Sequence, residues 1–114
     1  MLSKYSTEEL VNFAWQFYGV VEKVWRVNPT LFELRLLTRI GVAGADGVTA
    51  SQLVRDIGMS KASVSRKVLE FVEADVLEQR PSADGRSTTI HQTALSIARM
   101  ERWADEVRRI TPVD

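Results

Sequence analysis

The segment TASQLVRDIGMSKASVSRKVLEFVEADVLEQR, residues 49–80, decides the fold that we predict for this chain. Thr49 and Gln52 have the spacing of a capping box, which predicts the start of a short helix. Gly58 supplies a turn, and Ser60 is a favourable N-cap for a longer helix. A short helix, a tight turn and a longer helix are the sequence form of a helix-turn-helix.

The sequence on both sides completes a winged helix-turn-helix. Two short β-rich runs with a turn between them follow the longer helix, and a last helix capped by Thr93 follows the second run. Upstream, Thr30 and Glu33 form a further capping box. The predicted elements are helices at residues 6–28, 30–40, 51–57, 60–74 and 93–110, and strands at 76–80 and 88–92.

One face of the longer helix is apolar and the opposite face is polar. Val64, Val68, Phe71 and Val72 share a face and are expected to pack inward. The opposite face centres on Arg66 and carries small residues and hydroxyl groups. Such side chains can bond base edges and phosphates, and one helix fits the major groove of B-DNA. The DNA-contacting residues predicted here are Ser60, Lys61, Ala62, Ser63, Ser65, Arg66 and Lys67.

Charge is distributed unevenly along this helix. Lys61, Arg66 and Lys67 lie in its first half with no acidic residue among them, whereas Glu70 and Glu73 follow. The helix dipole prefers the opposite order, by roughly 0.3–1 kcal/mol per charge. The observed order is explained if a polyanion binds at the N-terminal half. The plainer interpretation is a solvated face with ordinary surface charges.

The loop between the two strands supplies a second candidate contact. The sequence PSADGR, residues 81–86, contains the Asp-Gly turn signal. Arg86 follows Gly85 at the tip, where its side chain is free to enter a minor groove or to bind a phosphate. Asp84 can hold the Arg86 side chain in place, or the two form only a surface ion pair worth less than ~1 kcal/mol.

The first helix is apolar around much of its circumference. It begins at a capping box of Ser6 and Glu9. Two apolar stripes run along it at helical spacing: Leu10, Phe13, Phe17, Val20 and Val24 form one, and Trp15, Tyr18, Val21 and Trp25 form the other. One stripe is enough to cover a core, so a partner subunit is the simplest cover for the second. The alternative is a central helix surrounded by its own chain.

Composition limits the functions that this chain can have. Its 114 residues suffice for a single domain, 1–114, with 45% hydrophobic and 26% charged residues. Net charge is zero, from 15 basic and 15 acidic residues, which argues mildly against nucleic-acid binding unless the charges are segregated. Without cysteine, a secretory signal or an apolar run of membrane-spanning length, the protein is expected to be cytoplasmic.

The sequence contains no pattern typical of an enzyme. His91 is the only histidine, and we expect a solvated or edge-packed strand residue rather than a catalytic base. There is no Ser-His-Asp set, phosphate-binding glycine loop or metal-ligand cluster, so no activity, cofactor or metal is predicted. Trp15, Trp25 and Trp103 can line a pocket for a small aromatic effector, although core or dimer contacts are the favoured interpretation.

Residues 30–103 resemble the core of the MarR/SlyA family of winged-helix regulators. TLFELRLLTRI is similar to the second helix of that family, SQLVRDIGMSKASVSRKVLEFVEADVLEQR to its helix-turn-helix, and DGRSTTIHQT to its wing. The D-x-R-S element, here Asp84, Arg86 and Ser87, is the most specific part. The resemblance implies that Asp84 braces Arg86, that Arg86 reaches the minor groove, and that residues 60–67 contact bases and phosphates.

The chain departs from the family pattern at three places, of which one, Ala94 and Leu95 where the family tends to have a charged residue and then glycine, matters little. The family usually has glycine where Asp75 stands, so the end of the recognition helix is expected to be strained or differently shaped. The final dimerisation helix of the family is absent or reduced, as in compact SarA-like relatives, so dimerisation is assigned to residues 6–28 and 93–110. The predicted interface residues are Phe13, Trp15, Phe17, Tyr18, Trp103, Val107 and Ile110.

These patterns predict a mainly α winged helix-turn-helix protein with a small β-hairpin. The predicted function is sequence-specific regulation of transcription by a homodimer that binds double-stranded DNA, as a repressor or autoregulator on a palindromic operator. The alternative is a protein-interaction winged helix without intrinsic DNA binding, whose working surface is the acidic stretch from Glu70 to Glu78.

Overall fold

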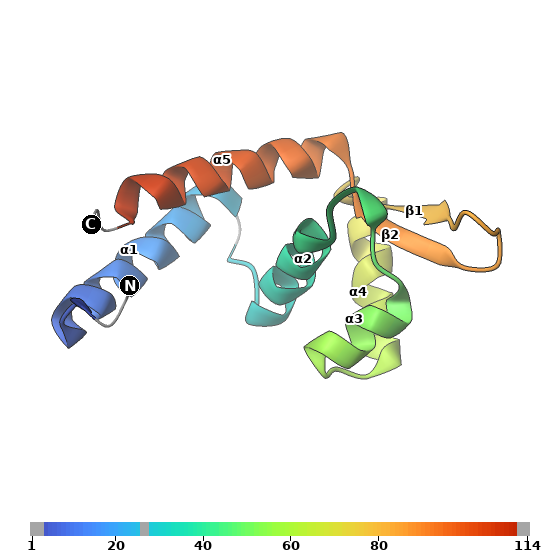
Figure 1. The fold of residues 1–114 in the computed structure, drawn as a ribbon, viewed down its shortest axis with the longest axis horizontal. Helices are drawn as coiled ribbons and strands as arrows, with labels where there is room; N and C mark the ends of the chain where they lie inside the picture. The colour runs from blue at the N-terminus through green and yellow to red at the C-terminus, as the bar shows by residue number, and fades with distance from the viewer. Residues whose placement is uncertain (1–3, 26–27, 112–114) are drawn as a thin grey trace. The chain divides into compact units, whose positions relative to one another are not determined.

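The computed structural model describes residues 4–25 and 28–111. Apart from one 3-10 helix, the elements follow in the predicted order, and the fold is mainly α with a β-hairpin (Figure 1). They are α1 (Thr7–Trp25), α2 (Leu31–Ala43), the 3-10 helix η2 (Gly44–Asp46), α3 (Ala50–Ile57), α4 (Lys61–Glu73), β1 (Leu77–Pro81), β2 (Thr88–Gln92) and α5 (Ala94–Ile110). The predicted end of the first helix falls partly on residues 26–27, outside the described residues.

Contacts divide the chain into two compact units, which are described separately. One unit is Pro29–Ala98, which contains the predicted helix-turn-helix and wing. The other combines the N-terminal residues up to Asn28 with those from Arg99 onward. The prediction of a single domain over residues 1–114 stays a prediction.

Capping boxes begin the helices where the sequence predicts them. In α2, Thr30 Oγ1 accepts a hydrogen bond from Glu33 N (3.1 Å), and Glu33 Oε1 accepts one from Thr30 N (2.8 Å). The same reciprocal pair joins Thr49 to Gln52 at the start of α3. Ser6 and Glu9 do so at the start of α1. Each box satisfies two amide donors that the first turn of a helix leaves free.

Buried aliphatic side chains hold the helix-turn-helix unit together. The core contains Leu36, Leu37 and Ile40 from α2, Leu53 and Ile57 from α3, and Val64 and Val68 from α4. Phe71 and Val72, also predicted to face inward, are only half-buried. Leu31, the first residue of α2, lies at the end of the packed face and is 73% exposed.

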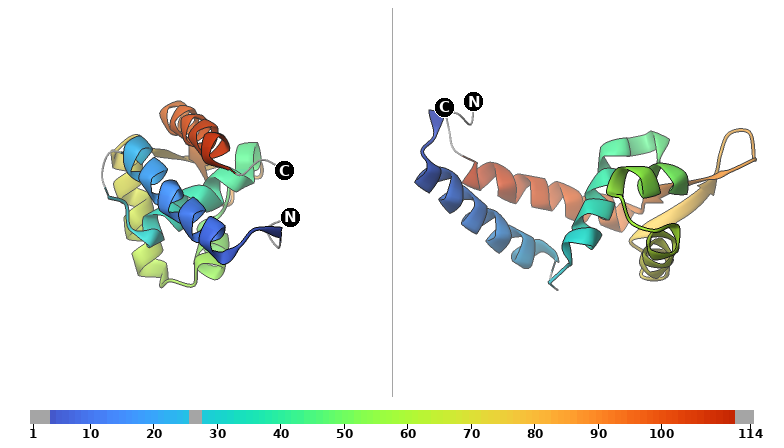
Figure 2. Two further views of the ribbon diagram at one scale, coloured as in Figure 1. Left: turned by 90° about the vertical axis from the view of Figure 1, so that its left-hand side faces the viewer. Right: turned by 90° about the horizontal axis from the view of Figure 1, so that it is seen from below.

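The hairpin pairs β1 with β2 in antiparallel register, Leu77 opposite Gln92 and Pro81 opposite Thr88. A third segment joins it at the base: Val48 N donates to Ile90 O (3.1 Å) and Ile90 N donates to Val48 O (2.7 Å). The sequence did not predict this bridge. Beyond it, the hairpin extends away from α2, α3 and α4 (Figures 1 and 2). The wing is therefore anchored at its base and free at its tip.

His91 is buried at the base of the wing, so the expectation of a solvated side chain is wrong and that of an edge-packed one is closer. It is 6% exposed, and its Nε2 lies 2.7 Å from Thr89 Oγ1. Gly47 lies against the ring: a Cβ there would come within 2.4 Å of His91 Cε1. Gly47 also has φ +71°, so both space and backbone conformation require glycine.

The end of α4 has the unusual backbone that the departure at position 75 predicts. Asp75 has φ +61° and is the only described non-glycine residue with positive φ. Asp75 N donates to Val72 O (3.1 Å) and Val76 N donates to Phe71 O (2.9 Å). This is the hydrogen-bond pattern of a Schellman motif, formed here without the usual glycine.

The second unit brings α1 together with the C-terminal part of α5. The Phe17 and Trp103 rings meet edge to face with centroids 5.7 Å apart. Lys23 Nζ lies 3.3 Å from Glu106 Oε1. The end of α1 is buried, whereas Val11, Trp15 and Tyr18 are 64%, 76% and 63% exposed. No helix in the described part of the chain is long and apolar enough to span a membrane.

Candidate nucleic-acid interface

The first half of α4 presents an open polar face. Ser60 caps the helix, since its Oγ accepts a hydrogen bond from Ser63 N (3.1 Å). Ser63 is half-buried, and its hydroxyl lies 2.9 Å from that of Ser60. The residues that the protein leaves exposed on this stretch are Ser60, Lys61, Ala62, Ser65 and Arg66. A second surface can therefore reach their side chains without displacing protein atoms.

The opposite face of this stretch is anchored in the core. Val64 is fully buried and Val68 is 3% exposed. Lys61 and Arg66 make no ion pair with any described residue. Their charge is available to a ligand, and the packing on the back of the helix fixes the direction in which they project.

Lys67 differs from its neighbours, because the protein neutralises it. Its Nζ lies 2.7 Å from Glu70 Oε2 and 3.3 Å from Glu33 Oε2. The hydrogen bond with Glu70, more than the one with Glu33, raises the Lys67 pKa above its usual value. The pKa of Glu33 is lowered, chiefly by the Thr30 amide that it accepts in the α2 capping box. The structure thus holds the Lys67 charge in ion pairs with Glu33 and Glu70, and the DNA contact of Lys67 stays a prediction.

The wing tip is held by Asp84, through the backbone rather than through the Arg86 guanidinium. Asp84 Oδ1 accepts hydrogen bonds from Ser82 Oγ (2.5 Å) and from Arg86 N (3.0 Å). These bonds lower the Asp84 pKa, the one from Ser82 most. Ser82 N in turn donates to Ser87 O (2.7 Å). The predicted side-chain pair of Asp84 and Arg86 is replaced by a brace on the loop.

This brace leaves Arg86 available to a ligand. Arg86 is exposed and forms no ion pair with a described residue. Ser87 is exposed beside it. Arg80, further down the wing, is occupied by Glu78, whose Oε1 lies 2.6 Å from Arg80 Nη2. Among the described residues, the wing therefore presents unpaired Arg86 at its tip, while Arg80, next to the last residue of β1, is neutralised.

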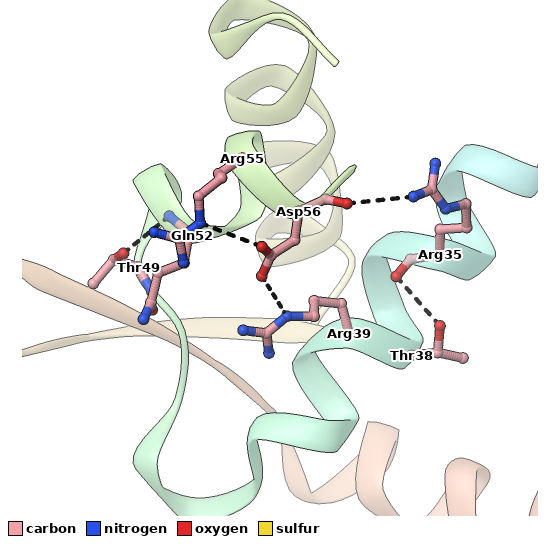
Figure 3. A network of polar contacts seen from close by, with 7 residues as sticks. All are labelled: Arg35, Thr38, Arg39, Thr49, Gln52, Arg55 and Asp56. Carbon is pink, nitrogen blue, oxygen red and sulfur yellow. Dashed lines mark hydrogen bonds and ion pairs between the residues drawn. The ribbon is translucent and has the colours of Figure 1, made fainter. Parts of the chain in front are cut away.

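Sequence reasoning missed the polar network that joins α2 to α3 (Figure 3). Arg35 Nη1 donates to Ile57 O (3.1 Å), and Arg35 also reaches Asp56 O, so it satisfies carbonyls at the end of α3. Arg39 Nε donates to Asp56 Oδ2 (2.9 Å), which lowers the Asp56 pKa. The spacing of Arg35 and Arg39, four residues apart on a helix, was the available signal.

Sequence reasoning also overlooked a basic pocket between the starts of α3 and α4. The pocket has a volume of about 240 Å³ and is lined by Ala50, Ser51, Val54, Arg55 and Lys61. The Arg55 side chain is 71% exposed, although its Nε lies 3.4 Å from Asp56 Oδ1. The DNA contacts predicted from the sequence lie on the longer helix and the wing, and Arg55 was not among them.

The predicted dimer residues fall into two groups. Phe13, Phe17 and Trp103 form an aromatic cluster within the chain, with Phe13 and Phe17 centroids 6.3 Å apart. Val107 and Ile110 are half-buried. Trp15 and Tyr18 face outward and are largely exposed. The indole N–H groups of Trp25 and Trp103 are buried without an acceptor among the described residues.

No family model matches the sequence, and no curated protein matches it significantly. Solved structures do match. MarR from E. coli is 16% identical with a TM-score of 0.62, covering 90% of this chain and 77% of MarR. The MepR–DNA complex of S. aureus is 16% identical with a TM-score of 0.67, covering 91% and 80% of the two chains. NadR in complex with 4-hydroxyphenylacetate is 17% identical with a TM-score of 0.66, covering 90% and 70%. The chain therefore has a MarR-like winged-helix fold.

Proposed function

We propose that this protein is a transcription regulator that binds double-stranded DNA in a sequence-specific manner. The observation that carries the proposal is the first half of α4, where Lys61 and Arg66 are exposed, form no ion pair with a described residue, and lie opposite the buried Val64. A helix of this kind fits the major groove. The MepR–DNA complex, which has a similar fold, supports the same use of the fold here.

Each part of the surface has a distinct proposed role. Arg66 reads a base edge, because it lies at the centre of the open face. Ser60, Lys61, Ala62, Ser63 and Ser65 contact phosphates or bases along the same groove. Arg86 enters the adjacent minor groove or binds a phosphate, and Asp84 and Ser87 fix the shape of the loop that carries it. Arg55 is added to the phosphate contacts on the strength of its exposure beside Lys61.

We further propose that the protein acts as a homodimer through residues 6–28 and 93–110. Trp15 and Tyr18 support this, because large apolar side chains in one stripe are seldom left in water. Phe13, Phe17, Trp103, Val107 and Ile110 would support the interface from behind. Two-fold symmetry would place two recognition helices about one DNA turn apart, on a palindromic operator.

The regulatory mode that we favour is repression or autoregulation, and the location that we propose is the cytoplasm. The NadR complex with 4-hydroxyphenylacetate supports a small aromatic effector as a further partner. No enzymatic role is proposed, because the matching structures named above are regulators.

A salt-dependent binding titration tests the DNA-binding proposal. Fragments selected from the source genome are titrated with the full chain at two salt concentrations. A DNA binder should lose affinity steeply as salt rises, because it displaces counterions from phosphates. Absence of binding to every fragment at low salt would overturn the proposal.

That negative result would favour a protein-interaction winged helix instead. The observation in its favour is the second half of α4, where Leu69 is 53% exposed beside Glu70 and Glu73. An apolar side chain among carboxylates suits a basic, partly apolar protein surface.

A further inference from the structure

Three cations lie on the predicted DNA-contacting face of α4. Of these, Lys67 is neutralised by other described residues of the protein. Its side chain is 24% exposed and lies between the carboxylates of Glu33 and Glu70. Lys61 and Arg66, on the same helix, are exposed and unpaired within the described residues. The protein thus presents two free cations on this helix and keeps a third in an internal pair.

Glu33 is held in position independently of Lys67. Its Oε1 accepts the Thr30 amide hydrogen bond at 2.8 Å and completes the α2 capping box, while its Oε2 faces Lys67 at 3.3 Å. The Glu33 side chain is only 22% exposed. Because the capping box already fixes this carboxylate, pairing with Lys67 costs little additional side-chain entropy.

Glu70 is the looser partner. It lies one turn after Lys67 on α4, and its side chain is 53% exposed. An exposed pair at this spacing is weak in water and is screened by salt. A phosphate of bound DNA can therefore displace Glu70 from Lys67 more readily than it can displace Glu33.

We propose that Glu33 and Glu70 restrain Lys67 and thereby limit non-specific DNA binding, with Glu70 as the partner that bound DNA displaces first. The inference rests on the proposed DNA-binding function. Non-specific affinity comes almost entirely from cations that neutralise phosphates, whereas base contacts supply discrimination. Withholding one cation therefore lowers affinity for every duplex by a similar factor, and sites without base contacts fall to the weakest binding.

The test compares wild type with the double variant E33Q/E70Q in binding to a labelled random-sequence duplex, followed by fluorescence anisotropy across a salt series. Glutamine also serves as the third residue of a capping box, so α2 keeps its start. The variant should bind more tightly, and the slope of log affinity against log salt should steepen by up to ~0.9, the value for one phosphate contact. The gain should then be about 3.5-fold larger at ~50 mM than at ~200 mM salt.

Two controls separate this effect from loss of negative charge or of stability. E73Q removes an exposed carboxylate from the same helix that has no ion pair within the described residues, and it should leave the salt slope unchanged. Adding K67M to E33Q/E70Q should abolish the gain, because the gain requires the Lys67 charge. E70Q alone, at an exposed site, should fold normally and give a smaller gain in the same direction.

The possible outcomes distinguish this inference from the function on which it rests. An unchanged salt slope in E33Q/E70Q, with wild type binding DNA normally, would overturn the inference and leave the proposed function intact. A gain that persists with K67M would also overturn it, because another residue would then be responsible. If wild type binds no duplex at low salt, the proposed function fails and the inference fails with it.

Discussion

Helices α1 and α4 place their charges in opposite ways. α1 begins with Glu8 and Glu9 and has Lys23 in its last turn. α4 has Lys61 at its start, no acidic residue in its first turn and no basic residue in its last. Negative charge near the start of a helix and positive charge near its end are favoured by the helix dipole. The charges of α1 therefore stabilise α1. Those of α4 do not stabilise α4, and their order suits an anionic ligand at its N-terminal half.

The stability of α4 must then come from other interactions. Its back packs into the core through Val64 and Val68, and Lys67 links it to α2. Its C-terminal end closes on Asp75 in a left-handed conformation, which glycine would adopt at lower cost. Tertiary packing therefore holds α4 in place, so the charges on its exposed face need not follow the order that stabilises an isolated helix.

The largest effect is expected from the packed back of α4. V64A removes a fully buried side chain and should lower the free energy of unfolding by about 2–3 kcal/mol, from lost burial and a residual cavity. Urea denaturation measures this. L69A, on the exposed side of the same helix, is the matched control and should change stability by only about 0.5 kcal/mol. Equal losses in the two variants would mean that the back of α4 does not anchor it.

The open face should show the reverse behaviour. R66A should weaken binding to a selected operator by ~1–3 kcal/mol and relax sequence preference at one base pair, if Arg66 reads a base. Its thermal stability should stay near that of wild type, because the side chain is exposed. E73A serves as the control for binding. Wild-type affinity and preference in R66A would contradict the role given to Arg66.

The backbone strain at the C-terminal end of α4 can be removed without changing the exposed face at residues 60–67. D75G should raise the free energy of unfolding by about 1 kcal/mol, because glycine adopts positive φ without steric cost. Thr93 Oγ1 donates to the backbone carbonyl of Asp75, so that bond survives the substitution. Thermal denaturation measures the gain. A loss of stability would show that the Asp75 side chain contributes more than its backbone costs.

Charge reversal at the starts of α1 and α4 should change the free energy of unfolding in opposite directions. K61E should stabilise the fold by roughly 0.3–1 kcal/mol through the helix dipole, while weakening DNA binding. E8K should destabilise α1 by a similar amount. Denaturant midpoints and anisotropy titrations on the same samples give both readouts. If K61E lost stability, the claim that α4 opposes its own dipole would be wrong.

The smallest effect is expected at low pH, at the capping box that begins α1. The pKa of Glu9 is lowered, first by the Ser6 backbone amide that it accepts. A carboxyl group with a lowered pKa stabilises the fold above its unfolded-state pKa, and that contribution is lost as pH falls through the folded-state value. The Ser6 amide should therefore keep its hydrogen bond at the ordinary pKa of glutamate and lose it only as pH falls further, through the lowered folded-state pKa of Glu9. NMR shifts of that amide test this, and E9Q should remove the pH dependence.

Local sequence signals predicted most of the fold. The capping boxes at Ser6, Thr30 and Thr49 act within four residues, so spacing alone locates them. The second strand was predicted with its observed bounds, Thr88–Gln92, since a clear turn and a capping threonine flank it. The strained end at Asp75 was also expected.

Contacts between distant residues were not predictable in this way. Lys67 meets Glu33 across 34 positions, Arg39 meets Asp56 across 17, and Val48 bridges to Ile90. Each depends on how helices and the hairpin pack, which no local spacing encodes. The same reason explains His91, whose burial follows from its contact with Gly47. The ion pairs of Lys67 were missed for the same reason, because they depend on tertiary packing.

The central claim is that the first half of α4 binds duplex DNA, and amide chemical-shift mapping tests it most directly. A selected duplex is added to the labelled full chain at low salt. We expect the largest shifts at residues 60–67 and at the wing tip, 84–87, with the amides of Glu70 and Glu73 moving less. Unmoved amides over residues 60–67, in a sample where the DNA is bound, would contradict the claim.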